Sequence, residues 1–348
     1  MQTPTPPTAS AEVAPPLQLM RMGLGYQVTQ LVAATARMGL ADLLREGPKS
    51  SGELAAATGA HGGSLFRFLR ACGSVGLLDE VGDDAFAVNP VSVCLQTHVQ
   101  SLHGFALGMG EAGHIRPFEK LYEAVMTGRS VVKEALGMDM WEYYDKNPSA
   151  KASLTEHLDE VARAVAPQVV ANFDVSRFTR IVDVGANQGF LLSAMLKAAP
   201  NATGVLFDRP EIVADARAAM EARGLADRVE IVGGDFRDEV PADGDLYLLK
   251  GILHDWDDAP AAQILRNCHR AARPGSSLLS LEGIVPSTPP LDPLVHMIDL
   301  SMLVLVGGRE RTREEFDKLF ESSGYRIERT VPLKLGYFPY HIIEARRI

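Results

Sequence analysis

The most constraining feature of this 348-residue sequence is the alternation of strand-like and helical segments from residue 180 onward. Short runs rich in β-branched and aliphatic residues recur, with helical patterns between most of them: RIVDVG, TGVLFD, RVEIV, DLYLLK, SLLSLEG, YRIERTV and YHIIEAR. Such alternation is typical of a parallel sheet with helices on both faces. The last two runs lie only about ten residues apart, too close for a helical crossover, and should form an antiparallel hairpin. The sequence therefore predicts a doubly wound α/β domain of about seven strands.

The first third of the chain has a different pattern. Apolar residues at helical spacings predict one long helix over 17–46. A short helix with capping-box spacing at Ser50 and Glu53 follows, then a third helix over 63–75 and two strand-like runs. Helices followed by a hairpin in this order predict a winged-helix-like domain over 17–105.

Three other segments complete the predicted organisation. Residues 1–16 are rich in Pro, Thr and Ala and predict a disordered tail. Residues 106–176 have helical patterns with many Met, His and aromatic residues, which suits a linker and substrate lid. The α/β domain then occupies 177–348.

The charge balance limits the possible partners. Lys and Arg number 34 against 44 Asp and Glu, which gives a formal net charge of -10. Winged helices often bind DNA, but the predicted wing carries four acidic residues, Asp79, Glu80, Asp83 and Asp84. Because phosphate contacts supply much of the affinity for DNA, these carboxylates would repel it. We therefore expect a dimerisation or packing module and no nucleic-acid partner.

The cysteine positions and the hydropathy bear on disulfides, metal sites and membrane partners. The cysteines at 72, 94 and 268 are far apart and lack CxxC spacing, so neither a disulfide framework nor a metal site is expected. No apolar run approaches the ~18 residues that span a bilayer, so no membrane partner is expected. A reducing, cytoplasmic location fits these features.

Polar residues gather where the predicted strands end. In a doubly wound sheet, ligands bind beyond the carboxyl ends of the strands, at the point where the strand order reverses. The residues at or just after the ends of the first four strands are Asp183, Gly185, Asp208, Asp235, Phe236 and Lys250. We expect them to form one ligand site.

The residue types at this edge suit an adenosine. Gly185 allows the backbone to approach a ligand closely, and Asp208 can accept hydrogen bonds from both ribose hydroxyls. Asp235 offers an acceptor for an exocyclic amine, and Phe236 a flat ring for stacking on a base. The loop has neither GxGxxG spacing nor a P-loop lysine, which points away from NAD and ATP. Two alternatives stay open: a tight strand–helix turn for Gly185, and a helix N-cap before Pro210 for Asp208.

With these residues the chain resembles S-adenosylmethionine-dependent small-molecule O-methyltransferases. This two-domain type includes plant caffeate and isoflavone enzymes and bacterial natural-product enzymes. The resemblance spans roughly residues 20–348 and is most specific in VDVGANQG, LLKGILHDWDD and GGRERTREEF. It implies a class I methyltransferase with a Rossmann-like, seven-stranded doubly wound sheet, preceded by an all-α winged-helix-like dimerisation domain. It also implies an intertwined homodimer.

The resemblance implies roles for the residues at the sheet edge. The cofactor would be S-adenosyl-L-methionine and its product S-adenosyl-L-homocysteine. Gly185 and Asp208 would hold the methionyl and ribose parts. Asp235 and Phe236 would hold the adenine, and Lys250 would contact the cofactor from the fourth strand.

His254 is the candidate catalytic base. It lies just past the fourth predicted strand, and an ordinary pKa near 6.5 suits removal of a proton from a phenol. In the resembled family, acids at the positions of Glu310 and Glu282 flank the histidine and would hold its other nitrogen. Asp255 is an alternative orienting group. The competing interpretation of His254 is a partly buried loop histidine.

The acceptor is the least defined part. Trp141, Met297 and Met302 fall where the family's pocket walls lie, although each could equally be core. Residues 304–306 are Val-Leu-Val where plant members often carry His-Asn-Pro, and Gly251 replaces a common aromatic, which favours the bacterial branch. The leading hypothesis is methyl transfer to a hydroxyl, phenolic by expectation, of an aromatic or polyketide-type secondary metabolite. The alternative is a homologue that binds the same cofactor but acts as a decarboxylase or hydroxylase.

Overall fold

The computed structural model describes residues 14–348 except 99, 215, 289–292 and 336–338. Residues 1–13 of the predicted tail therefore lie outside the described residues, and helix α1 (Pro15–Gly23) already includes the last two positions of that tail. The chain forms two compact units, Met1–Gly110 and Glu111–Ile348.

The first unit is a helical domain with a short sheet. Its further elements are α2 (Gly25–Arg37), α3 (Leu40–Leu43), β1 (Lys49–Ser50), α4 (Ser51–Thr58), α5 (Gly62–Ser74), β2 (Asp79–Glu80), β3 (Ala85–Ala87), α6 (Pro90–Val93) and α7 (His103–Met109). The prediction of one helix over 17–46 is wrong. Leu24 separates α1 from α2, and Gly39 adopts a left-handed φ of 63°, which glycine tolerates and a helix does not. The capping box at Ser50 and Glu53 is present, and the short strands pair in the order β1-β3-β2.

The second unit begins with helices. These are α8 (Ala112–Phe118), α9 (Leu121–Thr127), α10 (Val132–Leu136), α11 (Met140–Lys146) and the long α12 (Pro148–Asn172). Helix α12 starts at Pro148 because proline fits the first turn, where its missing N–H is not needed. Its side chains at Val161, Val165 and Val169, spaced by four residues, are buried in one hydrophobic cluster with the sheet.

A seven-stranded sheet forms the rest of this unit, and it confirms the predicted fold class. Its strands are β4 (Arg180–Val184), β5 (Thr203–Asp208), β6 (Val229–Gly233), β7 (Leu246–Lys250), β8 (Ser277–Gly283), β9 (Tyr325–Pro332) and β10 (Tyr340–Arg347). The strand order is β6-β5-β4-β7-β8-β10-β9. The first five in this order are parallel, whereas β10 runs antiparallel to both β8 and β9, as the predicted hairpin requires.

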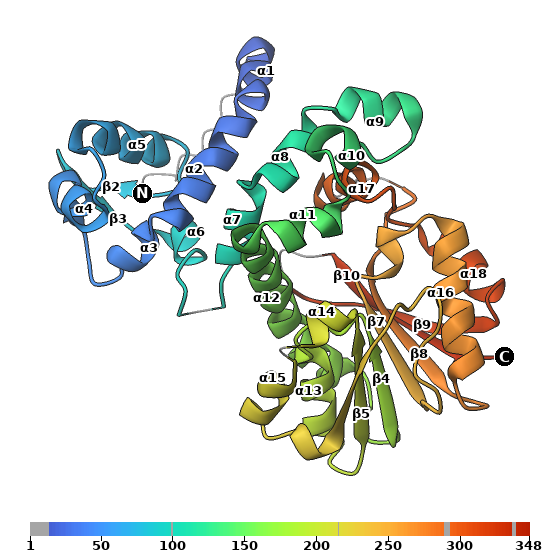
Figure 1. Ribbon diagram of the computed structural model, residues 1–348. Helices are drawn as coiled ribbons and strands as arrows, with labels where there is room; N and C mark the ends of the chain where they lie inside the picture. Colours follow the sequence, from blue (N-terminus) through green and yellow to red (C-terminus); the bar gives the residue numbers. More distant parts are fainter. Residues whose placement is uncertain (1–13, 99, 215, 289–292, 336–338) are drawn as a thin grey trace, which may run out of the picture. The chain divides into compact units, whose positions relative to one another are not determined.

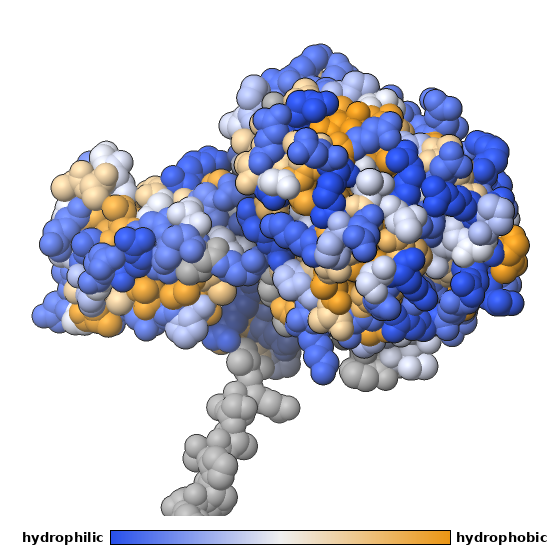
Figure 2. All heavy atoms as spheres, turned by 90° about the horizontal axis from the view of Figure 1, so that it is seen from below, coloured by the Kyte–Doolittle hydropathy of each residue, from blue (hydrophilic) through white to orange (hydrophobic). Residues whose placement is uncertain are grey.

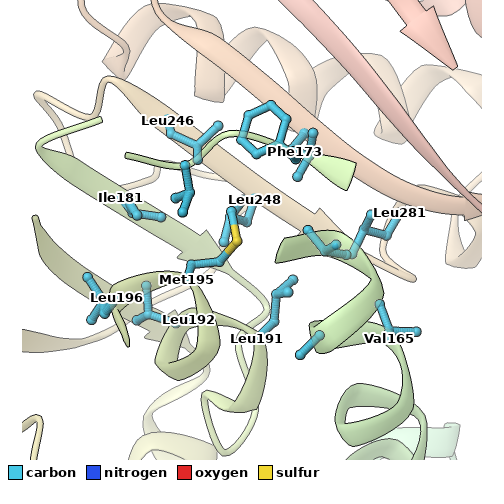
Figure 3. Packing of buried hydrophobic residues seen from close by; sticks show 14 of the residues in the cluster. Val165, Phe173, Ile181, Leu191, Leu192, Met195, Leu196, Leu246, Leu248 and Leu281 are labelled. Carbon is cyan, nitrogen blue, oxygen red and sulfur yellow. The ribbon is translucent and has the colours of Figure 1, made fainter. Parts of the chain in front are cut away.

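Helices cover both faces of the sheet. On one face lie α12, α13 (Phe190–Ala198) and α15 (Ala216–Ala222), and on the other lie α16 (Asp258–Ala271) and α18 (Arg313–Glu321) (Figure 1). The unit also contains α14 (Pro210–Val213), 3-10 turns at Ala226–Arg228 and Leu253–Asp255, and α17 (Pro293–Leu305), which packs against α8 and α9. Alternate residues of each strand face opposite sides. Ile181 and Leu248 pack with α12 and α13 (Figure 3), and Val182 and Leu249 pack with α16 and α18. Burial on both faces explains the nearly continuous apolar runs of the sequence.

The strand order reverses between β4 and β7, so this is the point at which the fold favours a ligand.

No helix of the described residues is long and apolar enough to cross a membrane. On the face drawn in Figure 2, hydrophilic residues surround smaller groups of hydrophobic ones. Cys72, Cys94 and Cys268 are free thiols. The cytoplasmic location stays a prediction, as do the boundaries expected at 105/106 and 176/177.

Candidate active site

The turn from β4 into α13 is built so that only glycine fits at its start. Gly185 has a φ of 75°, and a Cβ atom there would overlap the Ile252 side chain. Asn187 also has a positive φ of 48°, which is uncommon for a residue with a side chain. A side chain at residue 185 would therefore have to displace Ile252, and the contact of Gly185 with a ligand stays a prediction.

Asp208, at the end of β5, holds this loop in place. Its Oδ2 accepts a hydrogen bond from the Asn187 N–H at 2.8 Å, and its Oδ1 accepts one from the Arg209 N–H at 2.7 Å. The N-cap alternative for Asp208 is wrong, because the N-cap of α14 is Arg209 and no side chain caps that helix. Burial raises the pKa of Asp208.

Two more charged groups are buried at the same edge. Asp183 lies within β4 with only 2% exposure, and burial raises its pKa to about 7 even though Lys250 opposes the shift. Burial lowers the pKa of Lys250, at the end of β7, against the effect of Asp183, Glu282 and other nearby carboxylates. A positive group between buried carboxylates is thus built into the ends of β4 and β7.

Asp235 and Phe236 follow β6 directly. The Asp235 carboxylate pairs with Arg237, whose side-chain hydrogen bond lowers the pKa of this acid. Phe236 meets Trp256 edge to face, with ring centroids 6.1 Å apart, and the Arg237 guanidinium lies 5.1 Å from the Trp256 ring centroid. Trp256 is thus a second aromatic ring beside Phe236. The sequence analysis gave it no role, although it lies two residues after His254 in LLKGILHDWDD.

His254 lies on the 3-10 turn Leu253–Asp255 that follows β7. Its Nδ1 is 2.7 Å from Oε1 of Glu310, and its Nε2 is 3.6 Å from Oδ1 of Asp255. The structure therefore places Glu310 on one nitrogen and Asp255 near the other. Only 14% of the histidine side chain is exposed.

Glu282 contacts the main chain of this turn. Its Oε1 accepts hydrogen bonds from the Leu253 N–H at 3.0 Å and the Ile252 N–H at 3.3 Å, and from the Ser280 hydroxyl. Glu282 thus fixes the backbone that carries His254. It acts on the main chain, whereas the sequence predicted that it would hold a nitrogen of the imidazole.

The surroundings change the acidity of His254. Burial alone would lower its pKa, but Glu310, Asp255 and Glu282 outweigh burial and raise the pKa to about 10. Burial in turn raises the pKa of Asp255 and of Glu282. The ordinary pKa near 6.5 expected from the sequence therefore does not apply, because these carboxylates raise the pKa of His254.

The three side chains predicted at the acceptor pocket differ in exposure and in their contacts. Trp141 on α11 is 38% exposed, and the Arg209 guanidinium lies 5.0 Å from its ring centroid, next to Asp208. Met297 on α17 is 64% exposed, so neither of these two is core. Met302 is half-buried, and its carbonyl accepts the N–H groups of residues 306–308 at the end of α17. Their role as pocket walls stays a prediction.

Two polar residues near His254 escaped the sequence reasoning. Asp299 on α17 accepts the Glu310 N–H at 2.8 Å, and Arg311 is completely buried beside the histidine turn. The signals were present: Asp299 is a lone acid in the apolar helix PLVHMIDLSMLVL, and Arg311 directly follows Glu310 in GGRERTREEF. Among the described residues, no group of three or more His, Cys, Asp or Glu side chains could hold a metal ion.

The doubly wound sheet and its glycine turn, aspartate and histidine edge define a class I methyltransferase, and comparison with known proteins agrees. The O-methyltransferase domain profile matches residues 118–326, and the O-methyltransferase dimerisation domain profile matches residues 20–98. Phenazine O-methyltransferase PhzM of Lysobacter antibioticus is 39% identical over 332 residues, covering 95% of this chain and 96% of that protein. The mitomycin biosynthesis 6-O-methyltransferase of Streptomyces lavendulae is 37% identical over 348 residues, covering 99% of each.

A solved structure extends the comparison to bound ligands. An O-methyltransferase from neocarzinostatin biosynthesis, in complex with S-adenosylmethionine and 2-hydroxy-5-methyl naphthoic acid, has a TM-score of 0.81 and 27% identity. The match covers 97% of this chain and 100% of that one. The chain belongs to the O-methyltransferase family, whose members use S-adenosylmethionine as methyl donor. Its first unit carries the dimerisation domain of that family.

Proposed function

We propose that this enzyme transfers a methyl group from S-adenosylmethionine to a phenolic hydroxyl of an aromatic natural product, with His254 as general base. The observation that carries the proposal is the 2.7 Å contact between Nδ1 of His254 and Glu310. It fixes the imidazole through Nδ1 and leaves Nε2, which is 3.6 Å from Oδ1 of Asp255, as the nitrogen that would meet the acceptor. The relatives named above are a mitomycin biosynthesis 6-O-methyltransferase, a phenazine O-methyltransferase and an O-methyltransferase solved with a naphthoic acid, which supports an aromatic acceptor.

The residues present at the sheet edge fit the cofactor. Gly185, in the turn after β4, would hold the methionyl part, and the Asp208 carboxylate at the end of β5 would accept hydrogen bonds from the ribose. Asp235 and Phe236 would hold the adenine, and Lys250 would contact the cofactor from the end of β7. When bound, S-adenosylmethionine supplies a methyl group already activated by its sulfonium.

The protein's part of the reaction is proton transfer and positioning. His254 takes the acceptor's proton at Nε2, and Glu310 stabilises the resulting imidazolium through Nδ1. The neutral imidazole is the form that can take this proton, and the nearby carboxylates that raise the pKa of His254 make it a stronger base once its own proton has left. Because a bound sulfonium adds positive charge at this edge, His254 holds its own proton less tightly in the loaded enzyme than in the free one.

A homodimer is the second part of the proposal. Helix α1 and the residues just after it expose apolar side chains, namely Leu17, Leu19, Met20, Met22, Leu24 and Tyr26. An exposed apolar stripe of this kind favours burial against another chain, and the dimerisation domain profile covers residues 20–98. Analytical ultracentrifugation of the full chain should give twice the 37.6 kDa chain mass. A monomer at micromolar concentration would contradict the proposal.

The test of methyl transfer uses the full chain with S-adenosylmethionine and a panel of phenolic acceptors. We expect methylated product and S-adenosylhomocysteine, with kcat for His254→Ala lowered about 10²- to 10⁴-fold, the usual contribution of general acid–base catalysis. His61→Ala is a matched control, because His61 is an exposed helix N-cap in the first unit. Full activity of His254→Ala would refute the base. Tight cofactor binding without turnover on any acceptor would instead favour a non-methylating decarboxylase or hydroxylase.

A further inference from the structure

Arg311 is a buried cation whose ion pair does not explain its burial. Its side chain is 0% exposed, and it is the first among the largest fully buried side chains of the described residues. Burying an unpaired charge costs several kcal/mol, roughly, even after relaxation. The acid that contacts it is Asp258, 2.9 Å from Nε, but the Asp258 side chain is 64% exposed. A pair with one solvent-exposed partner contributes little, so the guanidinium must serve another purpose.

The guanidinium holds the main chain on both sides of His254. Nη1 donates to the carbonyl of Leu253 at 2.9 Å, and Nη2 donates to the carbonyl of Trp256 at 2.8 Å. These two carbonyls bracket the histidine and Asp255. A guanidinium presents its donors in one plane and in fixed directions, so a single side chain can hold both carbonyls in one arrangement.

The strand-like segment that carries Arg311 adds a contact to the histidine itself. The Arg309 N–H donates to the carbonyl of His254 at 2.8 Å. A Cβ atom at Gly308 would overlap that same carbonyl, so glycine permits this close approach. Three carbonyls of this stretch, those of Leu253, His254 and Trp256, are therefore held from residues 309–311, which also place Glu310 on the imidazole.

The histidine turn needs such external support. It is a 3-10 turn of three residues, without a side-chain N-cap, and short turns of this kind have few internal hydrogen bonds. From β8, Glu282 holds the N–H groups of Ile252 and Leu253, whereas the carbonyls are held by Arg311 and by the Arg309 N–H. A displacement of this backbone would move Nδ1 away from Glu310.

We propose that Arg311 is a positioning residue for His254: its guanidinium fixes the carbonyls on both sides of the histidine and so holds the imidazole on Glu310. The proposal deepens the proposed function, because it assumes that the imidazole is the working group. Arg311 has no direct role in the chemistry. It acts through the backbone of residues 253–256.

The experiment is a pH titration of His254 by NMR in the full, cofactor-free chain labelled with [13Cε1]histidine. The variant Arg311→Lys keeps the charge but loses the planar fork, so we expect the titration midpoint of His254 to fall by about one pH unit or more as the contact to Glu310 loosens. With an active acceptor, kcat should fall about 10²-fold, the effect of a small misplacement, with little change in KM for S-adenosylmethionine. Asp258→Asn should retain the midpoint, since both carbonyl contacts remain.

Arg228 provides the matched control. It is half-buried, and its guanidinium also holds main-chain carbonyls, those of Ala199 at 2.7 Å and Leu196 at 3.0 Å among them, at the opposite edge of the sheet. Arg228→Lys should lower the melting temperature and leave His254 unchanged. If Arg311→Lys does not fold, Arg311→Gln, which buries no charge, carries the same test.

An unchanged midpoint in a folded Arg311 variant overturns the proposal and leaves Arg311 with a merely structural role. Because the midpoint is measured without cofactor or acceptor, this outcome is independent of the activity of His254→Ala. The two proposals can therefore fail separately.

Discussion

Replacing Glu310 with glutamine should lower the pKa of His254 markedly. Among the groups that raise this pKa to about 10, Glu310 contributes most, through its charge and its 2.7 Å hydrogen bond to Nδ1. A hydrogen bond to a charged group contributes about 1.5–3 kcal/mol, and one pKa unit corresponds to about 1.36 kcal/mol. Glutamine keeps an acceptor oxygen but loses the charge. The pKa should therefore fall by about one to two units, to roughly 8–9, because Asp255 and Glu282 remain.

The assay is again the [13Cε1]histidine titration in the cofactor-free chain, with the His254 signal assigned by its loss in His254→Asn. Asp317→Asn is the control: Asp317 lies on the following helix α18 and pairs with Arg313, with Oδ1 2.9 Å from Nη2. A midpoint in Glu310→Gln equal to that of the wild type would refute the reasoning. So would an equal fall in Asp317→Asn, because the effect would then not be specific to Glu310.

Asp208→Ala should weaken binding of S-adenosylhomocysteine about 10- to 100-fold in calorimetry, since a charged acceptor for the ribose contributes about 1.5–3 kcal/mol; an unchanged Kd would remove Asp208 from the site. Gly185→Ala should abolish that binding, because the new Cβ would overlap Ile252 at a φ of 75°. Its control, Gly224→Ala, has a φ of 69° and nothing within 4 Å, so it should cost only about 1–2 kcal/mol of backbone strain in denaturation. Leu248→Ala, at a fully buried position, should lower the free energy of unfolding by about 2–5 kcal/mol in urea titration.

The sheet could be predicted because its signal is local. Buried parallel strands need apolar side chains on both faces, and RIVDV meets that need with Ile181 on one face and Val182 on the other. The hairpin followed from a short connection alone. The prediction of one helix over 17–46 was wrong because the signal that ends a helix there is not local. A glycine within a helical pattern is compatible with a continuous helix, and only the tertiary structure sets Gly39 in the left-handed region.

The candidate site was partly predictable for the same reason. Residues at strand ends lie on one edge by topology, so Asp208 and His254 could be grouped without coordinates. The functions of Glu282 and Arg311 could not, because their contacts reach 29 and 58 residues along the chain to the backbone of Leu253. A hydrogen bond to a main-chain group does not depend on the residue type of the partner, so the sequence does not reveal it. The raised pKa of His254 was missed likewise, since its carboxylates converge from β8, the 3-10 turn and the segment after α17.

The charged groups buried around His254 cost free energy of folding, and a role in stability alone does not explain them. Within the described residues, Oε2 of Glu282 and Oε2 of Glu310 are buried without a hydrogen-bond partner, and Arg311 is a buried cation. Buried ion pairs are often no more stabilising than apolar side chains of similar size, so a purely structural turn would be better filled with leucine or methionine. Sequences depart from such rules mainly at functional sites. In the proposed function, the excess of buried carboxylate at the carboxyl ends of β7 and β8 would stabilise the positive charge of an imidazolium and of a sulfonium methyl donor.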